Sequence, residues 1–180
     1  MPSPEIAIIM GSDSDLPTMQ AALEVCHHFD LPCEVAIISA HRTPERMITF
    51  SQTARERGLK VIIAGAGGSA HLPGMVAALT PLPVIGVPII GRTMQGIDSL
   101  YSIVQMPAGV PVATVAIGNA KNAGLLAVQI LAIDRPNLFD RVLEYRNQMK
   151  TEVLAKQSQL ETLGVQAYLE IRSKSGHATS

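Results

Sequence analysis

A histidine and an arginine stand side by side in the stretch "SAHRTP", between an apolar run and a proline. His41 can exchange a proton near neutral pH, because imidazole is the side chain that titrates in that range. Arg42 carries a permanent guanidinium that can hold a phosphate through two hydrogen bonds. The pair therefore suits acid–base chemistry on a small anion. The alternative is that His41 only closes a strand, and the other loops have to decide between the two.

A second polar stretch, "GSDSD" from Gly11 to Asp15, offers groups for binding an anion. It supplies a glycine for a turn, two hydroxyls and free backbone N–H groups near a helix start, which together favour phosphate. Asp15 could instead accept hydrogen bonds from sugar hydroxyls. The other interpretation is that Ser14 or Asp15 only caps the helix. Asp13 adds a carboxylate that would repel a phosphate unless it faces solvent.

A third stretch, Gly65 to Ala70, fits the pattern G-x-G-x-x-A of dinucleotide-binding loops. Two observations disfavour that interpretation: the stretch follows the third apparent strand, and "VIGVPII", about 20 residues later, has no acidic residue for a ribose. Small residues also let a flat ring or carbon dioxide approach the backbone closely. His71 comes next, where it either lines a pocket or caps the following helix.

Strands and helices must bring these three loops together if they are to form one site. Five apolar runs rich in β-branched residues predict strands: "EIAIIM", "CEVAIIS", "KVIIAGA", "LPVIGVP" and "VPVATVAI". Helical spacing separates them at 17–30, 44–57, 71–79 and from about 98 into "SIVQM". Thr43 can cap the second helix and Gly58 can end it. This alternation predicts a three-layer α/β/α sandwich around a parallel sheet, flavodoxin-like or Rossmann-like, with the loops gathered at the carboxyl ends of the strands.

Composition excludes several classes of protein. The chain has 180 residues, of which 47% are hydrophobic, so one domain with a buried core is expected. Fourteen Lys and Arg against 15 Asp and Glu give a net charge of -1, which disfavours nucleic acid as a partner. Cys26 and Cys33 lack CxxC spacing and are expected to be reduced and structural. No membrane-spanning run or secretion signal occurs, which favours the cytoplasm.

Taken together, several motifs resemble one family, the catalytic subunits of phosphoribosylaminoimidazole carboxylase of purine biosynthesis. They are "MGSDSD", "SAHRTP", "AGAGGSAHLPGM", "GVP" and "DSLYSIVQMPAGVPVATVAIG", within residues 5–133. The segment from "SLYSIVQMP" onward is similar to the bacterial mutase branch. That branch isomerises N5-carboxyaminoimidazole ribonucleotide to 4-carboxy-5-aminoimidazole ribonucleotide. The animal-type branch instead carboxylates aminoimidazole ribonucleotide with carbon dioxide.

The resemblance implies roles for individual residues. Ser12 and Asp15 would contact the ribonucleotide, Ser14 and Arg42 would hold its phosphate, and His41 would be the general acid and base. The complete expected substrate-binding set is Ser12, Ser14, Asp15, Ser39, Ala40, Arg42, Gly67, Gly68, Ala70, His71 and Leu72. No metal or organic cofactor is expected. A direct carboxylase, a dinucleotide-dependent enzyme and a noncatalytic phosphosugar-binding or nucleotide-binding module remain the alternative functions.

The C-terminal part raises questions of assembly. Leu138, Val142, Tyr145, Met149 and Val153 have the spacing of an amphipathic helix. The resemblance implies a homo-octamer in which this helix packs on a neighbouring subunit, whereas the alternative is that it covers its own sheet. It also implies functional coupling to the ATP-dependent synthetase that makes the substrate. We expect one domain over 1–157 and a tail over 158–180, with a short helix and a flexible end. Arg92 either reaches the site or faces water.

Overall fold

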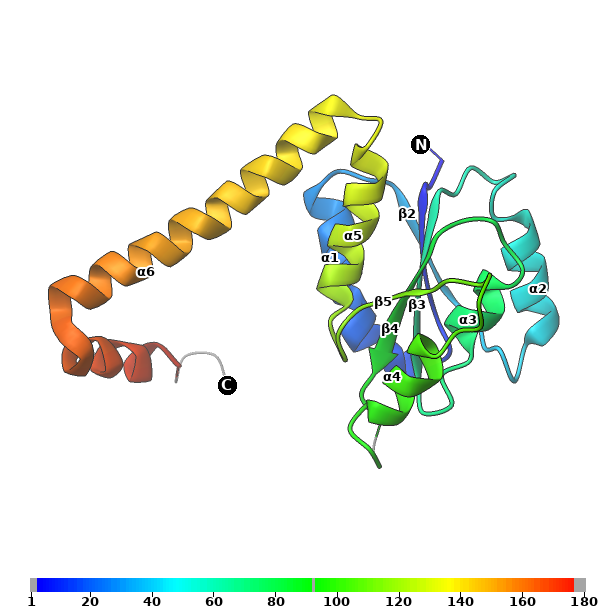
Figure 1. Cartoon of the computed structure of the whole chain (residues 1–180), viewed down its shortest axis with the longest axis horizontal. Coiled ribbons are helices and arrows are strands. Elements are labelled where there is room, and N and C mark those ends of the chain that lie inside the picture. Colours follow the sequence, from blue (N-terminus) through cyan, green and yellow to red (C-terminus); the bar gives the residue numbers. More distant parts are fainter. Residues whose placement is uncertain (1–2, 92, 177–180) are drawn as a thin grey trace. The chain divides into compact units, whose positions relative to one another are not determined.

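Five parallel strands form the central sheet, in the order β2-β1-β3-β4-β5 (Figure 1). The computed structural model describes residues 3–91 and 93–176. The strands are β1 (Ile6–Met10), β2 (Cys33–Ile37), β3 (Val61–Gly67), β4 (Val84–Ile89) and β5 (Ala113–Thr114). Each corresponds to one of the apolar runs, so the predicted parallel sheet is confirmed. The chain runs outward from β1 to β2 and returns to β3, which makes the β1–β3 boundary the switch point where such folds bind ligands.

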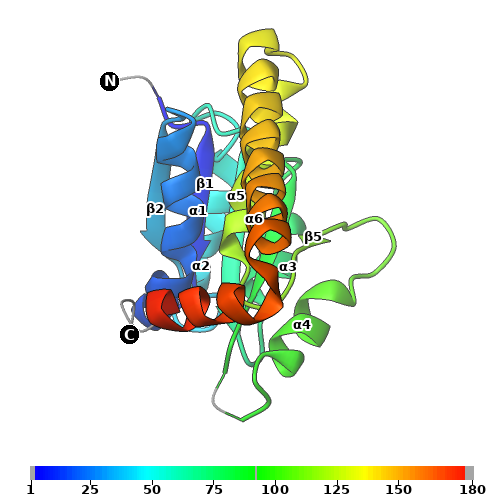
Figure 2. The ribbon, with the colours of Figure 1, turned by 90° about the vertical axis from the view of Figure 1, so that its left-hand side faces the viewer.

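Helices cover both faces of the sheet. The helices α1 (Leu16–His28) and α5 (Ala120–Ala132) lie side by side on one face, as Figures 1 and 2 show. The helices α2 (Pro44–Thr53), α3 (Leu72–Ala77) and α4 (Ile97–Val104) cover the other face (Figure 1). The predicted three-layer α/β/α sandwich is therefore confirmed.

Side-chain alternation along the strands divides the core into two halves. Ala7 and Ile9 of β1 belong to a cluster with buried residues of α2, α3 and α4. Ile6 and Ile8 point to the opposite face, because successive side chains of a strand alternate, and they are at most 1% exposed. Contacts on both faces explain why these strands are apolar throughout. The edge strand β2 is an exception, because Val35 and Ile37 are 43% and 46% exposed.

Close packing on the α1–α5 face depends on glycine. A Cβ added to Gly124 of α5 would lie 2.9 Å from Cβ of Val25 and 3.2 Å from the backbone of Ala22. Real Cβ atoms do not approach so closely, so the two helices can make this contact only because Gly124 has no side chain. In the same layer, Met19 of α1 occupies the space in which a side chain at Gly65 would lie. Packing on this face therefore depends on the absence of a side chain at both Gly124 and Gly65.

The predicted ends of α2 are only partly correct. Pro44 lies in the first turn as expected, because its fixed φ suits that position. Thr43 precedes the helix but does not cap it: its hydroxyl accepts from the N–H of Ser39 and donates to the Ser39 carbonyl, both at 3.0 Å. The helix ends at Thr53, and Gly58, with φ of 94°, closes the turn beyond it. The prediction of a Thr43 cap was wrong because the Thr43 hydroxyl forms its hydrogen bonds with the Ser39 backbone instead.

The chain divides into two compact units, Met1–Leu138 and Phe139–Ser180. The helix α6 (Pro136–Gly176) contains most of the second unit and is interrupted at Gly164, which has φ of 73°. The predicted amphipathic segment is therefore helical, and helix continues beyond 158. Within the first unit, Arg135 after α5 forms an ion pair with Glu5 before β1. In the part of the chain that is described, none of the helices is long and apolar enough to cross a membrane.

Candidate active site

A cavity of about 550 Å³ opens at the carboxyl ends of β1, β2, β3 and β4. The residues that line it are Gly11, Ser12, Ser14, Asp15, Ser39, His41, Arg42, Gly67, Ile89, Ile90 and Gly91. They come from loops that are far apart in sequence and meet because parallel strands end at one edge of the sheet. The candidate site is thus at the position that the topology favours.

The first loop is held in shape by a reciprocal pair of hydrogen bonds. The Ser12 hydroxyl accepts from the Ser14 N–H at 3.4 Å, and the Asp15 carboxylate accepts from the Ser12 N–H at 3.1 Å. This capping box starts the short 3-10 turn Asp13–Asp15 that precedes α1. Ser12 caps this turn, and Asp15, one of the two residues expected to cap the helix, is at the N-cap position of α1 but makes no side-chain capping bond there. Burial, the largest influence, raises the pKa of Asp15 above its usual value, although hydrogen bonds from Ser12 and Ser14 oppose the effect.

Asp13 is exposed and does not line the cavity, which answers the question of its orientation. Its carboxylate accepts from the Ser14 N–H at 3.1 Å and from the Ser12 hydroxyl at 3.0 Å. The N–H groups of Ser12 and Ser14 therefore already have partners within the loop. The expectation that they are free to bind an anion was wrong, because nearby carboxylates compete for them.

Arg42 joins the first loop to the second. Its Nη2 donates to the Gly11 carbonyl at 3.1 Å, and its Nε donates to the Ser39 hydroxyl at 3.3 Å. The same hydroxyl also accepts from the Arg42 backbone N–H at 3.2 Å. The side chain stays exposed at the cavity, so a guanidinium whose position is fixed by protein contacts faces the space where an anion would lie.

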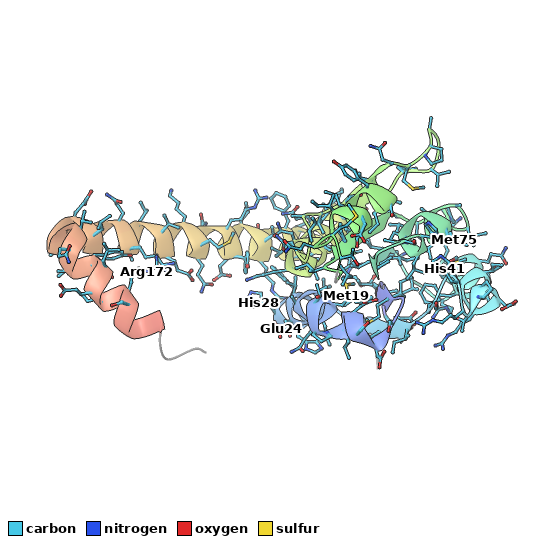
Figure 3. The ribbon with its side chains drawn as sticks, turned by 90° about the horizontal axis from the view of Figure 1, so that it is seen from below. Met19, Glu24, His28, His41, Met75 and Arg172 are labelled. Carbon is cyan, nitrogen blue, oxygen red and sulfur yellow. The ribbon has the colours of Figure 1, made fainter. Side chains whose placement is uncertain are left out.

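His41 forms a hydrogen bond with a second histidine. Its Nε2 lies 2.8 Å from Nδ1 of His71, and the two rings are nearly perpendicular, at 87°. One nitrogen must donate and the other accept, and whichever ring donates, the bond orients the His41 ring. His71 precedes α3 but its side chain makes no capping bond. Figure 3 places His41 on the side of the sheet that carries α2 and α3, away from Glu24 and His28 of α1.

The structure brings most of the predicted residues together. The cavity lining includes Ser12, Ser14, Asp15, Ser39, His41, Arg42 and Gly67, but not Ala40, Gly68, Ala70, His71 or Leu72. Ala40, Ala70 and Leu72 are buried in the apolar core. His71 reaches the site indirectly, through its hydrogen bond to His41.

Sequence reasoning missed Gly11, Ile89, Ile90 and Gly91 as members of the lining. Gly11 was recognised only as a turn residue. The other three follow from strand order, because β4 pairs with β3 and its carboxyl end must lie beside that of β3. Inspecting the loop after the fourth strand together with the first three would have found them. Arg92, which follows them, lies outside the described residues.

No cluster of three or more His, Cys, Asp or Glu side chains within residues 3–91 and 93–176 could hold a metal ion. The groups that the site offers are a hydrogen-bonded imidazole, a guanidinium, hydroxyls and a buried carboxylate. This set can bind a phosphorylated sugar and move a proton.

Comparison with known proteins gives the family. Residues 5–152 match the model of the AIR carboxylase family. The N5-carboxyaminoimidazole ribonucleotide mutase of Synechocystis is 71% identical over 169 residues, which are 94% of this chain and 96% of the relative. The Thermotoga maritima protein of the same name is 60% identical over 92% of this chain and 97% of the relative.

Two further likenesses concern a fused relative and a solved structure. The phosphoribosylaminoimidazole carboxylase of Schizosaccharomyces pombe is 59% identical over 92% of this chain, which spans 30% of that longer protein. The crystal structure of Treponema denticola PurE superposes with a TM-score of 0.79 at 28% identity, covering 87% of this chain and 98% of the other. Given the family match over residues 5–152 and these near-full-length relatives, the chain belongs to the AIR carboxylase family.

Proposed function

We propose that the protein isomerises N5-carboxyaminoimidazole ribonucleotide to 4-carboxy-5-aminoimidazole ribonucleotide in purine biosynthesis. The observation that carries the proposal is a cavity in which His41 and Arg42 stand side by side in a chain 71% identical to a mutase of that name. The reaction needs one proton donor and acceptor together with binding groups for a phosphate and a ribose. The lining residues include each of these chemical types.

The reaction has two steps that share one proton. In the first, the bond between N5 and the carboxylate carbon breaks, its electron pair goes to N5, His41 supplies the proton and carbon dioxide leaves. In the second, C4 of the imidazole attacks the carbon dioxide, and His41 takes the proton that C4 loses. His41 therefore ends in the state in which it began. The hydrogen bond to His71 holds the ring in one orientation for both transfers.

Binding energy far from the reacting atoms positions the imidazole. We assign the ribonucleotide phosphate to Arg42 and Ser14, and the ribose hydroxyls to Ser12 and Asp15. Because Arg42 already bonds to the Gly11 carbonyl and the Ser39 hydroxyl, it does not have to be ordered when the substrate binds. The backbone near Gly67 would then face the flat base, with Gly68, Ala70 and Leu72 contributing backbone atoms only. Such a small-residue surface excludes water while carbon dioxide is free.

The direct carboxylase remains the principal competing function. Fused relatives named phosphoribosylaminoimidazole carboxylase are 56–59% identical to this chain, but the chain spans only 29–30% of their length. The relatives named mutase match over 94–97% of their own length. The match to the mutases extends over nearly their whole length, which favours the mutase function. A binding module without catalysis would not need the His41–His71 pair.

Initial rates with two substrates test the proposal. The purified protein is given N5-carboxyaminoimidazole ribonucleotide in one reaction and aminoimidazole ribonucleotide with bicarbonate in another, and 4-carboxylated product is measured. We expect product chiefly from the first. Efficient product from the second alone would assign the protein to the carboxylases, and tight ribonucleotide binding with no product from either would indicate a binding module.

We also propose that the active form is a homo-octamer and that it works with the ATP-dependent synthetase that supplies its labile substrate. The exposed apolar residues Phe139, Leu143 and Val153 of α6 support an assembly, since they are 51%, 46% and 63% exposed. The boundary between a catalytic domain over 1–157 and a tail over 158–180 also stays a prediction. Sedimentation of the full chain tests the octamer.

A further inference from the structure

Ser99 of α4 joins the ends of two strands beside the cavity. Its side chain is fully buried, at 0% exposed. Its hydroxyl donates to the Ile89 carbonyl at 2.7 Å and accepts from the Gly68 N–H at 2.8 Å. Ile89 ends β4, and Gly68 follows the last residue of β3. A single hydroxyl from the helical layer therefore connects two strands of the sheet at the edge where the candidate site lies.

The hydroxyl takes the place of a direct bond in the strand ladder. The last pair in the register of these strands is Gly67 with Ile89, and both residues line the cavity. Beyond that pair, the chain of hydrogen bonds runs from the Gly68 N–H to the Ser99 oxygen and from the Ser99 proton to the Ile89 carbonyl. Direct N–H to carbonyl bonds bring neighbouring strands to about 2.9 Å between N and O. An interposed hydroxyl separates the two strand ends and fixes their separation.

The same helix fixes the peptide groups on both sides of Gly68. This residue has φ of 62°, a conformation that favours glycine. Its carbonyl lies 3.2 Å from the Ser102 hydroxyl, which also donates to the Asp98 carbonyl at 2.7 Å. Since a hydroxyl has one proton and the Asp98 bond is shorter, Ser102 holds Gly68 more weakly than Ser99 does. Ser99 is thus the stronger anchor of the backbone that turns away from β3.

We propose that Ser99 is a positioning residue for the carboxyl transfer. By fixing the Gly67–Gly68 backbone against Ile89, it keeps the surface that faces the imidazole base closed to water, so that carbon dioxide stays until C4 captures it. The inference rests on the proposed function. Ser99 is shielded behind Gly68 and acts through that residue. Phosphate and ribose recognition, by contrast, belongs to Ser12, Asp15 and Arg42.

Kinetics of Ser99→Ala test the role. We expect kcat to fall about tenfold, because the variant loses both hydrogen bonds of the buried hydroxyl and part of that loss raises the barrier to carboxyl transfer. We expect KM to change by less than about twofold, because the loops that bind phosphate and ribose keep their own hydrogen bonds. Aminoimidazole ribonucleotide should also be released faster than by spontaneous decarboxylation. This leak is the readout that a general loss of stability would not produce.

Ser51→Ala is the matched control. Ser51 is 1% exposed, and its hydroxyl donates to the Met47 carbonyl at 2.8 Å within α2. The variant therefore also deletes a buried serine hydroxyl, but one that bonds within its own helix. We expect its kcat and its release of aminoimidazole ribonucleotide to equal those of the wild type. A leak of the same size in both variants would contradict the role of Ser99.

Amide hydrogen exchange gives a readout that needs no turnover. The Gly68 amide should exchange faster in Ser99→Ala than in the wild type and in Ser51→Ala, as measured by NMR. If Ser99→Ala does not fold, Ser99→Cys keeps a small side chain with weaker hydrogen bonding and takes its place.

The outcomes separate the two proposals. If the Gly68 amide exchanges faster in Ser99→Ala but kcat is unchanged and no extra aminoimidazole ribonucleotide is released, the positioning role is overturned and the proposed function stands. A wild type that makes no 4-carboxylated product from N5-carboxyaminoimidazole ribonucleotide would overturn the proposed function itself, and the positioning role with it.

Discussion

At the scale of single residues, a substitution of His41 should abolish proton transfer and leave ligand binding intact. His41 faces the cavity and His71 supports its ring through the 2.8 Å hydrogen bond. In His41→Asn the side chain can still form hydrogen bonds but cannot transfer a proton near neutral pH. We expect kcat to fall at least about 100-fold, while calorimetry still detects binding of 4-carboxy-5-aminoimidazole ribonucleotide.

His27→Asn serves as the control for this prediction, because His27 is an exposed histidine in the last turn of α1 and does not line the cavity. Its turnover should match that of the wild type. Normal turnover in His41→Asn would remove His41 from the mechanism, and failure of that variant to fold would mean that the residue is structural.

Asp15, which we assign to the ribose hydroxyls, should lower the stability of the folded chain at neutral pH. Its pKa is raised mainly by burial, so ionising the carboxyl is less favourable in the folded chain than in the unfolded one. The resulting destabilisation is absent at low pH, where the carboxyl is protonated in both states, and grows as pH rises through the raised pKa. We therefore expect Asp15→Asn to have a higher Tm than the wild type near pH 7 and to bind the ribonucleotide more weakly.

The Tm advantage of Asp15→Asn should shrink toward about pH 3, below the ordinary pKa of an aspartate. Thermal unfolding followed by circular dichroism between these pH values measures it. Asp13→Asn, which removes an exposed carboxylate from the same loop, controls for the loss of a charge. A Tm difference for Asp15→Asn that does not depend on pH would rule out this explanation.

The sequence named residues that line the cavity where one loop carries them, and it missed residues that depend on two elements. His41, Arg42, Ser12, Ser14 and Asp15 could be named because their side-chain types suggest a function in isolation, and their roles stay predictions. Ser99 could not be named, because its partners Gly68 and Ile89 are brought to it by strand register. The hydrogen bond from the Ser14 N–H to the Asp13 carboxylate could not be predicted either, since it depends on the conformation of the turn.

At the scale of elements, two helical glycines should respond differently to the same substitution. Gly124→Ala places a Cβ against Cβ of Val25 and the backbone of Ala22, which cannot move without shifting α1 away from α5. We expect it to lower the free energy of unfolding by about 1–3 kcal/mol. In Gly74→Ala of α3, the added Cβ meets only the thioether end of Met106, a flexible side chain.

Gly74→Ala should therefore be nearly neutral, because the better helix propensity of alanine offsets a small rearrangement of Met106. Urea unfolding of both variants at one pH gives the comparison. Equal losses of stability would show that glycine at these positions matters for a reason other than the atoms that surround it.

The strands were predicted correctly because a short β-branched apolar run bounded by Gly or Pro seldom forms anything other than a buried strand. The pattern could not show that β5 is reduced to Ala113–Thr114, since the surrounding residues are equally apolar. Nor did it separate α5 from the strand before it, because its small residues, among them Ala123, Gly124 and Ala127, do not show a wide apolar stripe. They are small because α1 packs so closely against them, which only the fold reveals.

At the scale of the whole molecule, the second unit exposes apolar residues that support the proposed assembly. Phe139, Leu143, Val153 and Leu154 of α6 are between 46% and 63% exposed. We expect Leu143→Lys to reduce the mass of the assembly measured by analytical ultracentrifugation, because burying a lysine at an apolar contact costs free energy.

Gln148→Lys introduces the same residue at another exposed position of α6 and should leave the mass of the assembly unchanged. A monomeric wild type would contradict the octamer outright. An octamer that tolerates Leu143→Lys would show that this part of α6 lies outside the interface. The sequence predicted an amphipathic helix here and a short helix in the tail, and in the structure both belong to α6, which is interrupted at Gly164.

The close contact between α1 and α5 makes the sandwich mechanically asymmetric. Where backbone touches backbone, as at Gly124 and Ala22, there is no side chain that can change rotamer to absorb a displacement. The opposite layer packs through side chains that can, such as Met106 against Gly74. At the contact of Gly124 with Ala22, α1 and α5 should therefore move together, whereas a small displacement at Gly74 can be taken up by the Met106 side chain.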